Sequence, residues 1–284
     1  MLSRTLDWLR GHRIVHIVAI ITYYVLVVAP HKRFGAFLNE SVAGTFGLKI
    51  STIEGRYQYN LFVMSVACIL LLVVSLVVLR KLRAHPERKK IGAYYIANTI
   101  LAAIIINLLF VINIEVVHFP QYAMFAILIF PLVGTYTGSL AWATIGGMLD
   151  EAYQYFYLAP KDTSYYDLND VVTNLCGAVF GLLILATFKI KEYNQFRIKT
   201  SSIWIGLSLV ILAVVMAHLS GVLSIYPSED RPYHILREWP PGFWSHVNPD
   251  VTYHVIRPIE GVIITVLLWI GFSRIGPNHT SQDA

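Results

Sequence analysis

The sequence has little charge. Asp, Glu, Lys and Arg make up 14% of its 284 residues, against about 25% in a typical soluble domain. Hydrophobic residues make up 56%, and the mean hydropathy is +0.59. Several apolar runs reach about 20 residues, which is the length of helix that crosses a bilayer. The composition therefore excludes an ordinary soluble domain and predicts an all-α, polytopic bundle of transmembrane helices.

Cysteine is also scarce, which excludes a disulfide framework and a cysteine-rich metal site. The two cysteines, Cys68 and Cys176, both lie in apolar runs, and we expect them to be small buried residues. No small-residue cleavage site follows the first apolar run, so we expect a retained helix there. The basic pI of about 9.1 does not indicate a nucleic-acid partner, because the charges can be assigned to the two sides of a membrane.

The hydropathy pattern predicts eight spans in three parts of the chain. The parts are an N-terminal helix pair (1–90), a four-helix core (91–190) and a C-terminal helix pair (191–284). The expected spans are 14–30, 59–79, 92–113, 119–135, 139–158, 170–188, 202–222 and 255–273. A glycine-flanked turn at 134–138 should make the fourth and fifth spans a tight hairpin, and Pro131 should bend the fourth.

Charge gives the orientation of these spans. With the N-terminus inside, the inner segments contain 14 of the 22 Lys and Arg residues, and the outer segments contain 13 of the 17 Asp and Glu residues. An excess of Lys and Arg marks the cytoplasmic side, so both termini should be cytoplasmic. The long outer loop 223–254 is aromatic, and Trp239, Phe243 and Trp244 beside Pro240-Pro241-Gly242 predict an irregular segment at the membrane interface.

Acidic residues interrupt the apolar sequence between positions 146 and 181. The fifth span places Glu151 and Gln154 on one helical face, below the outer surface. A carboxylate at that depth needs a partner, and His118 is the first candidate. Asp150 points to another side of the helix, and we expect it to face water.

The sixth span carries a second group of polar residues. Asp170, Asn174, Gly177 and Gly181 follow the spacing i, i+4, i+7, i+11 and should line one face. The glycines would let another helix approach closely. Asp170 and Asn174 would either cap and join helices or contribute to a site.

Two further segments could converge on the same side. His118 and Tyr122 lie one turn apart at the start of the fourth span. Arg257 opens the eighth span, where it could pair locally with Glu260 or reach Glu151 or Asp170.

These residues, in this order, resemble the VanZ-like family of bacterial membrane proteins. The resemblance covers positions 115–190 and consists of HF-x-x-Y at 118–122, E-x-x-Q-x-F at 151–156 and D-x-x-x-N-x-x-G-x-x-x-G at 170–181. Glu115 stands where a lysine is common, and Lys161-Asp162 stand where the family favours arginine. The resemblance implies a cell-envelope role in the bacterial cytoplasmic (inner) membrane. The founding member of the family is associated with low-level antibiotic resistance, against teicoplanin.

We therefore expect an outward-facing polar pocket that binds a membrane lipid or a lipid-linked envelope precursor. Its expected residues are His118, Tyr122, Glu151, Gln154, Asp170, Asn174 and Arg257. We expect no cofactor, no metal and no nucleic acid.

Two alternatives remain open. One is an intramembrane hydrolase or transferase in which His118 is the general base. Glu151 and Asp170 would orient it or hold a metal, and Tyr122 would polarise the substrate, although no nucleophile elbow or H-E-x-x-H motif is present. The other is an accessory subunit that docks partner proteins of a larger membrane complex through the loop 223–254.

Overall fold

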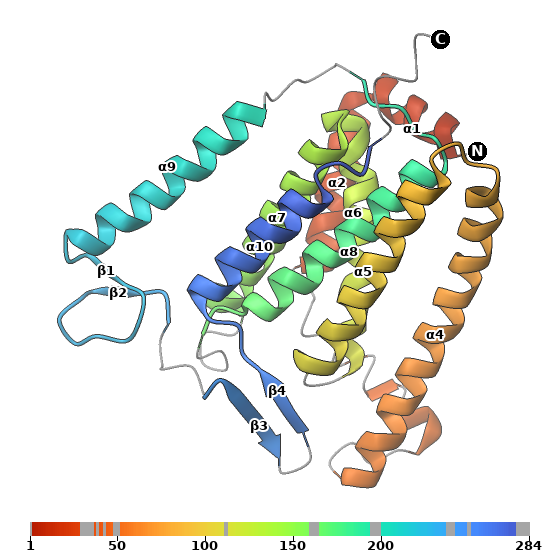
Figure 1. Ribbon diagram of the computed structural model, residues 1–284. Helices are drawn as coiled ribbons and strands as arrows, with labels where there is room; N and C mark the ends of the chain where they lie inside the picture. Colours follow the sequence, from red (N-terminus) through yellow and green to blue (C-terminus); the bar gives the residue numbers. More distant parts are fainter. Residues whose placement is uncertain are drawn as a thin grey trace.

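The computed structural model describes residues 2–28, 37, 40–41, 44–47, 52–110, 113–158, 165–193, 200–236, 242–248 and 251–276. The chain is mostly helical (Figure 1). Its helices are α1 (Leu2–Gly11), α2 (Arg13–Val28), α4 (Ile53–Arg83), α5 (Arg88–Leu108), η1 (Asn113–Val117), α6 (His118–Val133), α7 (Tyr136–Tyr153), η2 (Gln154–Leu158), α8 (Leu168–Thr187), α9 (Thr200–Leu219) and α10 (Pro258–Phe272). Each range that we predicted as a span overlaps one of the long helices.

Fewer helices are long and apolar enough to cross a membrane than the eight that we predicted. Within the described residues they are four, at Glu54–Arg83, Arg88–Leu108, Glu115–Val133 and Leu168–Thr187. The bent pair α1 and α2, which turns by 111°, would make a fifth, and α10 is apolar but shorter. The amphipathic helix α1 is one element that our prediction omitted. The structure thus supports a helical bundle with four or five candidate spans.

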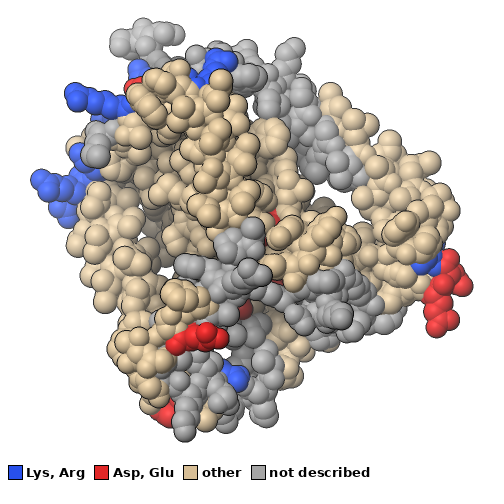
Figure 2. Space-filling view, turned by 180° about the vertical axis from the view of Figure 1, so that it is seen from behind, with Lys and Arg blue, Asp and Glu red and all other residues tan. Residues whose placement is uncertain are grey.

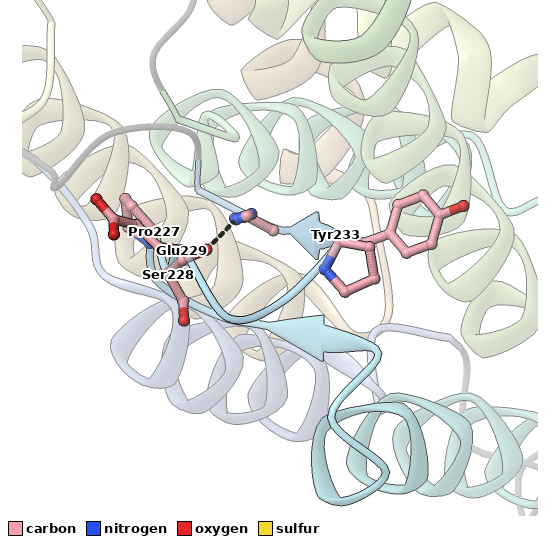
Figure 3. Close-up of a pocket in the computed structure, with 6 residues that line it drawn as sticks. Pro227, Ser228, Glu229 and Tyr233 are labelled. Atoms are coloured by element: carbon pink, nitrogen blue, oxygen red, sulfur yellow. Dashed lines mark hydrogen bonds between the residues drawn. The ribbon is translucent and has the colours of Figure 1, made fainter.

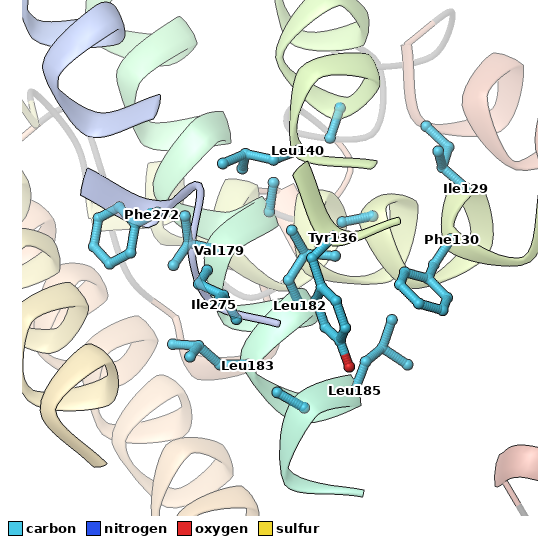
Figure 4. Packing of buried hydrophobic residues seen from close by; sticks show 14 of the residues in the cluster. Ile129, Phe130, Tyr136, Leu140, Val179, Leu182, Leu183, Leu185, Phe272 and Ile275 are labelled. Atoms are coloured by element: carbon cyan, nitrogen blue, oxygen red, sulfur yellow. The ribbon is translucent and has the colours of Figure 1, made fainter. Parts of the chain in front are cut away.

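Helix α8 occupies the centre of the bundle. In the membrane-length stretch of α8, 83% of the residues are buried, whereas in that of α4 only 11% are buried. Helices α5, α6, α7 and α10 all pack against α8, as Figure 1 shows. The core between them contains Phe130, Tyr136, Leu140, Leu182 and Leu185, all of which are fully buried (Figure 4). Outward-facing apolar side chains on α4 are the surface expected of a helix in contact with lipid.

The α6–α7 hairpin forms as predicted. Gly134 ends α6 with a positive φ of 80°, a conformation that glycine adopts without steric cost. Thr135 then caps α7, because its side chain accepts a hydrogen bond from the backbone N–H of Gly138. Short connections of this kind hold the two helices side by side and antiparallel.

The glycines of α8 bring it against the backbone of α6, which confirms their predicted role. A Cβ at Gly177 would lie 2.8 Å from the carbonyl oxygen of Phe119, and one at Gly181 would overlap the carbonyl of Ala123. Only a residue without a side chain fits there. This contact fixes the register in which Asp170 and Asn174 meet α6.

Helix α2 is attached to the hairpin through side chains that bond to helix backbone. His16 Nε2 lies 2.6 Å from the carbonyl oxygen of Leu128, and the Tyr24 hydroxyl donates to the carbonyl of Gly146 at 2.6 Å. These bonds place Tyr24 beside the C-terminal half of α7.

The cysteines differ in their surroundings. Cys176 is buried in α8, where its thiol contacts the Asn98 side chain at 3.3 Å, as we expected of a buried residue. Cys68 is exposed, so our prediction for it was wrong. Hydropathy alone does not distinguish a core position from an outer face of α4, because both are apolar.

The segment 223–254 contains regular structure that we did not predict. Strands β1 (Leu223–Ser224) and β2 (Tyr233–His234) pair in parallel, and β3 (Trp244–Asn248) and β4 (Val251–His254) form an antiparallel hairpin. Phe243 and Trp244 lie against the His254 ring, with centroids 4.0 and 5.7 Å away. Trp239 lies outside the described residues.

The two ends of the bundle carry opposite charges. Figure 2 shows Lys and Arg side chains gathered at one end, where α4 ends and α5 begins, and Asp and Glu side chains mostly at the other. This arrangement agrees with the assignment of charges to two sides that the sequence predicts.

We expect Gly181→Ala to destabilise the protein by about 1–3 kcal/mol, because its methyl group would force α6 and α8 apart. Gly271→Ala in α10 is the matched control, since nothing lies within 4 Å of a Cβ at that position. The control should leave stability unchanged or raise it by about 0.5–1 kcal/mol. The measurement is unfolding of the purified protein in detergent micelles. Equal stability of the two variants would show that the helices do not touch at Gly181.

Candidate functional site

Polar side chains from α6, α7 and α8 meet at the acidic end of the bundle. We call this group the polar cluster; it consists of His118, Tyr122, Asp150, Glu151, Gln154, Asp170 and Asn174. Six of its members are the residues that we predicted from the sequence, and Asp150 is the addition. Most of the cluster is buried, with His118, Tyr122, Asp150, Glu151 and Asn174 each exposing 2% or less.

His118 is held between two residues of α8. Its Nδ1 lies 2.8 Å from Asn174 Oδ1, and its Nε2 lies 3.7 Å from Asp170 Oδ2. Asp170 and Asn174 are four residues apart, so one face of α8 supplies both contacts. The structure thus places the Asp170 carboxylate within 4.0 Å of His118, whereas the prediction names Glu151 as its partner.

Asp150 is the residue that our prediction placed wrongly. It is fully buried, and the Tyr122 hydroxyl donates to its Oδ2 at 2.8 Å. Gln154 Nε2 lies 3.2 Å from both Asp150 Oδ1 and Glu151 Oε1, so one amide joins the two carboxylates. The i, i+4 spacing of Asp150 and Gln154 was a usable signal. The residues Gln154–Leu158 form a π-helical turn, which is a local widening often found at functional sites.

Two tyrosines that we did not predict enclose the carboxylates. The Tyr166 hydroxyl donates to the carbonyl of Met148 at 2.6 Å. Tyr24, on α2, donates to the carbonyl of Gly146 two residues earlier in α7. Both phenols lie close enough to Asp150 and Glu151 to interact with them electrostatically. No sequence motif links Tyr24 to α7, because their contact depends on how α2 packs.

The cluster contains an excess of negative charge. Asp150, Glu151, Asp167 and Asp170 interact with one another electrostatically. Among the residues that the structure describes, no Lys or Arg lies within 4.0 Å of any of them. Burial, and secondly the neighbouring Asp170, raise the pKa of Asp167 to about 7. Unpaired buried charge is unfavourable by several kcal/mol per ion, so the site favours a proton or a cation.

One donor in the cluster has no partner. Asn174 Nδ2 is buried and makes no hydrogen bond within the described part of the chain. It faces α7, since a Cβ at Gly147 would lie only 3.4 Å from it. Gly147 precedes Asp150 and Glu151 by about one turn. An unsatisfied buried donor costs about 1–3 kcal/mol, which an oxygen atom of a ligand would recover.

Arg257 does not join the cluster. It is the N-cap residue of α10, and its backbone N–H donates to Glu260 Oε2 at 3.2 Å. No ion pair within 4.0 Å links it to Glu151 or Asp170 among the described residues. The segment lies nearby, because the Ile256 N–H donates to Asn169 Oδ1 at 2.9 Å. The predicted ion pair with Glu260 is replaced by this backbone hydrogen bond, and the Glu260 carboxylate lies 2.8 Å from His254 Nε2.

The described surface includes two hollows of different character. A groove of about 250 Å³ beside the cluster is lined by Tyr24, Val25, Val28, Leu149 and Tyr153. An open hollow of about 570 Å³ is formed by residues 227–234 alone, where His234 Nε2 lies 2.8 Å from the Ser228 carbonyl (Figure 3). Only the groove adjoins the polar cluster, through Tyr24.

The predicted turn between the fifth and sixth spans falls in a part of the chain that the structure does not describe. Pro160 and Lys161-Asp162, where this chain departs from the VanZ-like pattern, lie outside the described residues. Within the described ranges, no group of three or more His, Cys, Asp and Glu side chains is arranged to hold a metal ion.

No protein-family model, curated protein or solved structure matches this chain.

We expect Tyr122→Phe to destabilise the protein by about 1–3 kcal/mol, because it leaves the buried Asp150 carboxylate without its hydroxyl donor. Tyr157→Phe is the control, since Tyr157 is 77% exposed and should tolerate the change. Unfolding in detergent measures both. If the two variants are equally stable, the Tyr122–Asp150 hydrogen bond does not contribute.

Proposed function

We propose that this chain is a VanZ-like protein of the bacterial cytoplasmic membrane with a role in the cell envelope. The polar cluster binds an amphiphilic or lipid-linked ligand from the outer side. The supporting observation is the cluster itself: three helices bring buried acceptors, an imidazole and an unpaired amide to one end of an apolar bundle. Polar residues at such positions are unfavourable for folding, which makes a binding role the best account of them.

We propose eight spans with both termini in the cytoplasm. The separation of basic and acidic ends in Figure 2 supports this orientation, since basic residues favour the cytoplasmic side. The cluster lies at the acidic end, and α4 runs from that end to the basic one. The cluster would therefore face outward.

A bond-breaking reaction at the same site is the second candidate. The observation that favours it is the buried His118–Asp170 pair at 3.7 Å, because a carboxylate beside an imidazole favours its protonated form during proton transfer. A hydrolase or transferase would change the mass of the bound amphiphile during incubation, whereas a binding protein would release it unchanged.

The orientation can be tested by cysteine labelling in intact cells. In a Cys68→Ala background, Glu54→Cys should react with a membrane-impermeant maleimide from outside. Lys81→Cys, at the other end of α4, should react only after permeabilisation. Cys176 is fully buried and should stay unlabelled. The opposite labelling pattern would reverse the proposed orientation.

The envelope role can be tested through teicoplanin tolerance in a host that lacks this protein. We expect expression of the native chain to raise tolerance, and Glu151→Gln or Asp170→Asn to return it to the empty-vector level. Glu229→Gln, at an exposed position, should behave as the native chain. Membrane levels of all variants are compared by immunoblot. Full tolerance in both cluster variants at normal membrane levels would contradict the proposal.

A further inference from the structure

The charge of the polar cluster restricts what it can bind. The three carboxylates of the cluster interact with one another and with the neighbouring Asp167, and the imidazole of His118 is the single basic group within 4.0 Å of these four among the described residues. An anionic headgroup would be repelled by this arrangement. A protonated amine would compensate the charge and donate to the carboxylates through short, charge-assisted hydrogen bonds.

The unpaired amide adds a second requirement. Asn174 Nδ2 is a donor that lies about one helical turn from Asp150 and Glu151, on the facing helix. It needs an acceptor oxygen in the same ligand. A headgroup that carries an ammonium group close to an oxygen atom would satisfy both the carboxylates and the amide.

The groove beside the cluster supplies a place for hydrocarbon. Its volume, about 250 Å³, is slightly below the range of about 300–1,000 Å³ for small-molecule pockets, so it suits a single hydrocarbon chain. Val25 and Val28 of α2 form one wall, and Leu149 and Tyr153 of α7 form the other. Leu149 and Tyr153 flank Asp150 and Glu151 in sequence. Tyr24 lines the groove and also interacts electrostatically with Asp150 and Glu151, so a chain in the groove would leave the headgroup close to the carboxylates.

We propose that the ligand is an amphiphile with a protonated amine in its headgroup. This inference rests on the amphiphile-binding function proposed above. The ammonium group binds between Asp150 and Glu151, an adjacent oxygen accepts from Asn174 Nδ2, and the hydrocarbon chain lies in the groove between α2 and α7. The competing possibilities are an amphiphile with an anionic headgroup and one with a neutral headgroup.

Dodecylamine is a suitable probe, because an alkylamine is protonated near neutral pH. The purified full chain in dodecyl maltoside is titrated with dodecylamine, dodecyltrimethylammonium and dodecyl phosphate, and adducts are counted by native mass spectrometry. The detergent is itself a neutral, hydroxyl-rich competitor in excess. We expect one dodecylamine to bind saturably. Its Kd should be at least about tenfold lower than that of dodecyltrimethylammonium, which cannot donate a hydrogen bond, and than that of dodecyl phosphate, which carries the opposite charge.

Variants test each part of the site. Glu151→Gln should weaken dodecylamine binding about tenfold or more, as expected for the loss of a charged hydrogen bond. Leu149→Trp should also weaken it, by filling the groove. The controls are Glu229→Gln and Leu209→Trp, which change exposed positions on the β1–β2 loop and on α9. Because all variants share the same micelles, partition of the probe into detergent cancels.

The outcomes separate this inference from the function on which it rests. Saturable binding of dodecyl phosphate that depends on Glu151 would overturn the amine headgroup while leaving an amphiphile site in place. Equal binding of dodecylamine to the native chain and to Glu151→Gln would overturn the assignment of the ammonium to this carboxylate. Failure of every probe to bind saturably would overturn both proposals.

Discussion

The close contact between α6 and α8 is the constraint on which the rest of the structure depends. Gly177 and Gly181 let the α8 backbone reach the carbonyls of Phe119 and Ala123. In a bilayer, apolar side chains gain little by leaving lipid for another helix, so such backbone contact and its dispersion energy become important. Once α8 is fixed in this register, the next turns toward its N-terminus must face the start of α6.

The polar cluster follows from that geometry. Asn174 and Asp170 continue the glycine face of α8 by about one and two turns, so both reach His118. Gly147 gives α7 a similar close approach to Asn174, which brings Asp150 next to Tyr122. The same small residues that hold the helices together thus also bury the polar groups, and the hydrogen bonds between those groups offset part of the desolvation.

The sequence predicts what depends on periodicity within one helix. The spacing of Asp170, Asn174, Gly177 and Gly181 fixes one face whatever that face contacts, and the structure confirms it. Asp150 could not be placed in this way. Adjacent helical residues point about 100° apart, so a pocket that contains Glu151 predicts that Asp150 points away from it. The site instead surrounds α7 on two sides, with α6 contacting one carboxylate and Gln154 linking both.

Contacts between helices that lie far apart in the sequence could not be predicted from the sequence. Nothing in the α2 sequence distinguishes Tyr24 from an interfacial tyrosine, yet its bond to the Gly146 carbonyl makes it a wall of both the cluster and the groove. Arg257 shows the same limit, since its spacing from Glu260 predicts a local ion pair, whereas the structure shows a bond from its backbone N–H and pairs the Glu260 carboxylate with His254. Without that arginine, the carboxylates of Asp150 and Glu151 have no basic group within 4.0 Å inside the described fold. Burying two such charges without a partner is unfavourable by several kcal/mol per ion, which favours a ligand that brings the cation.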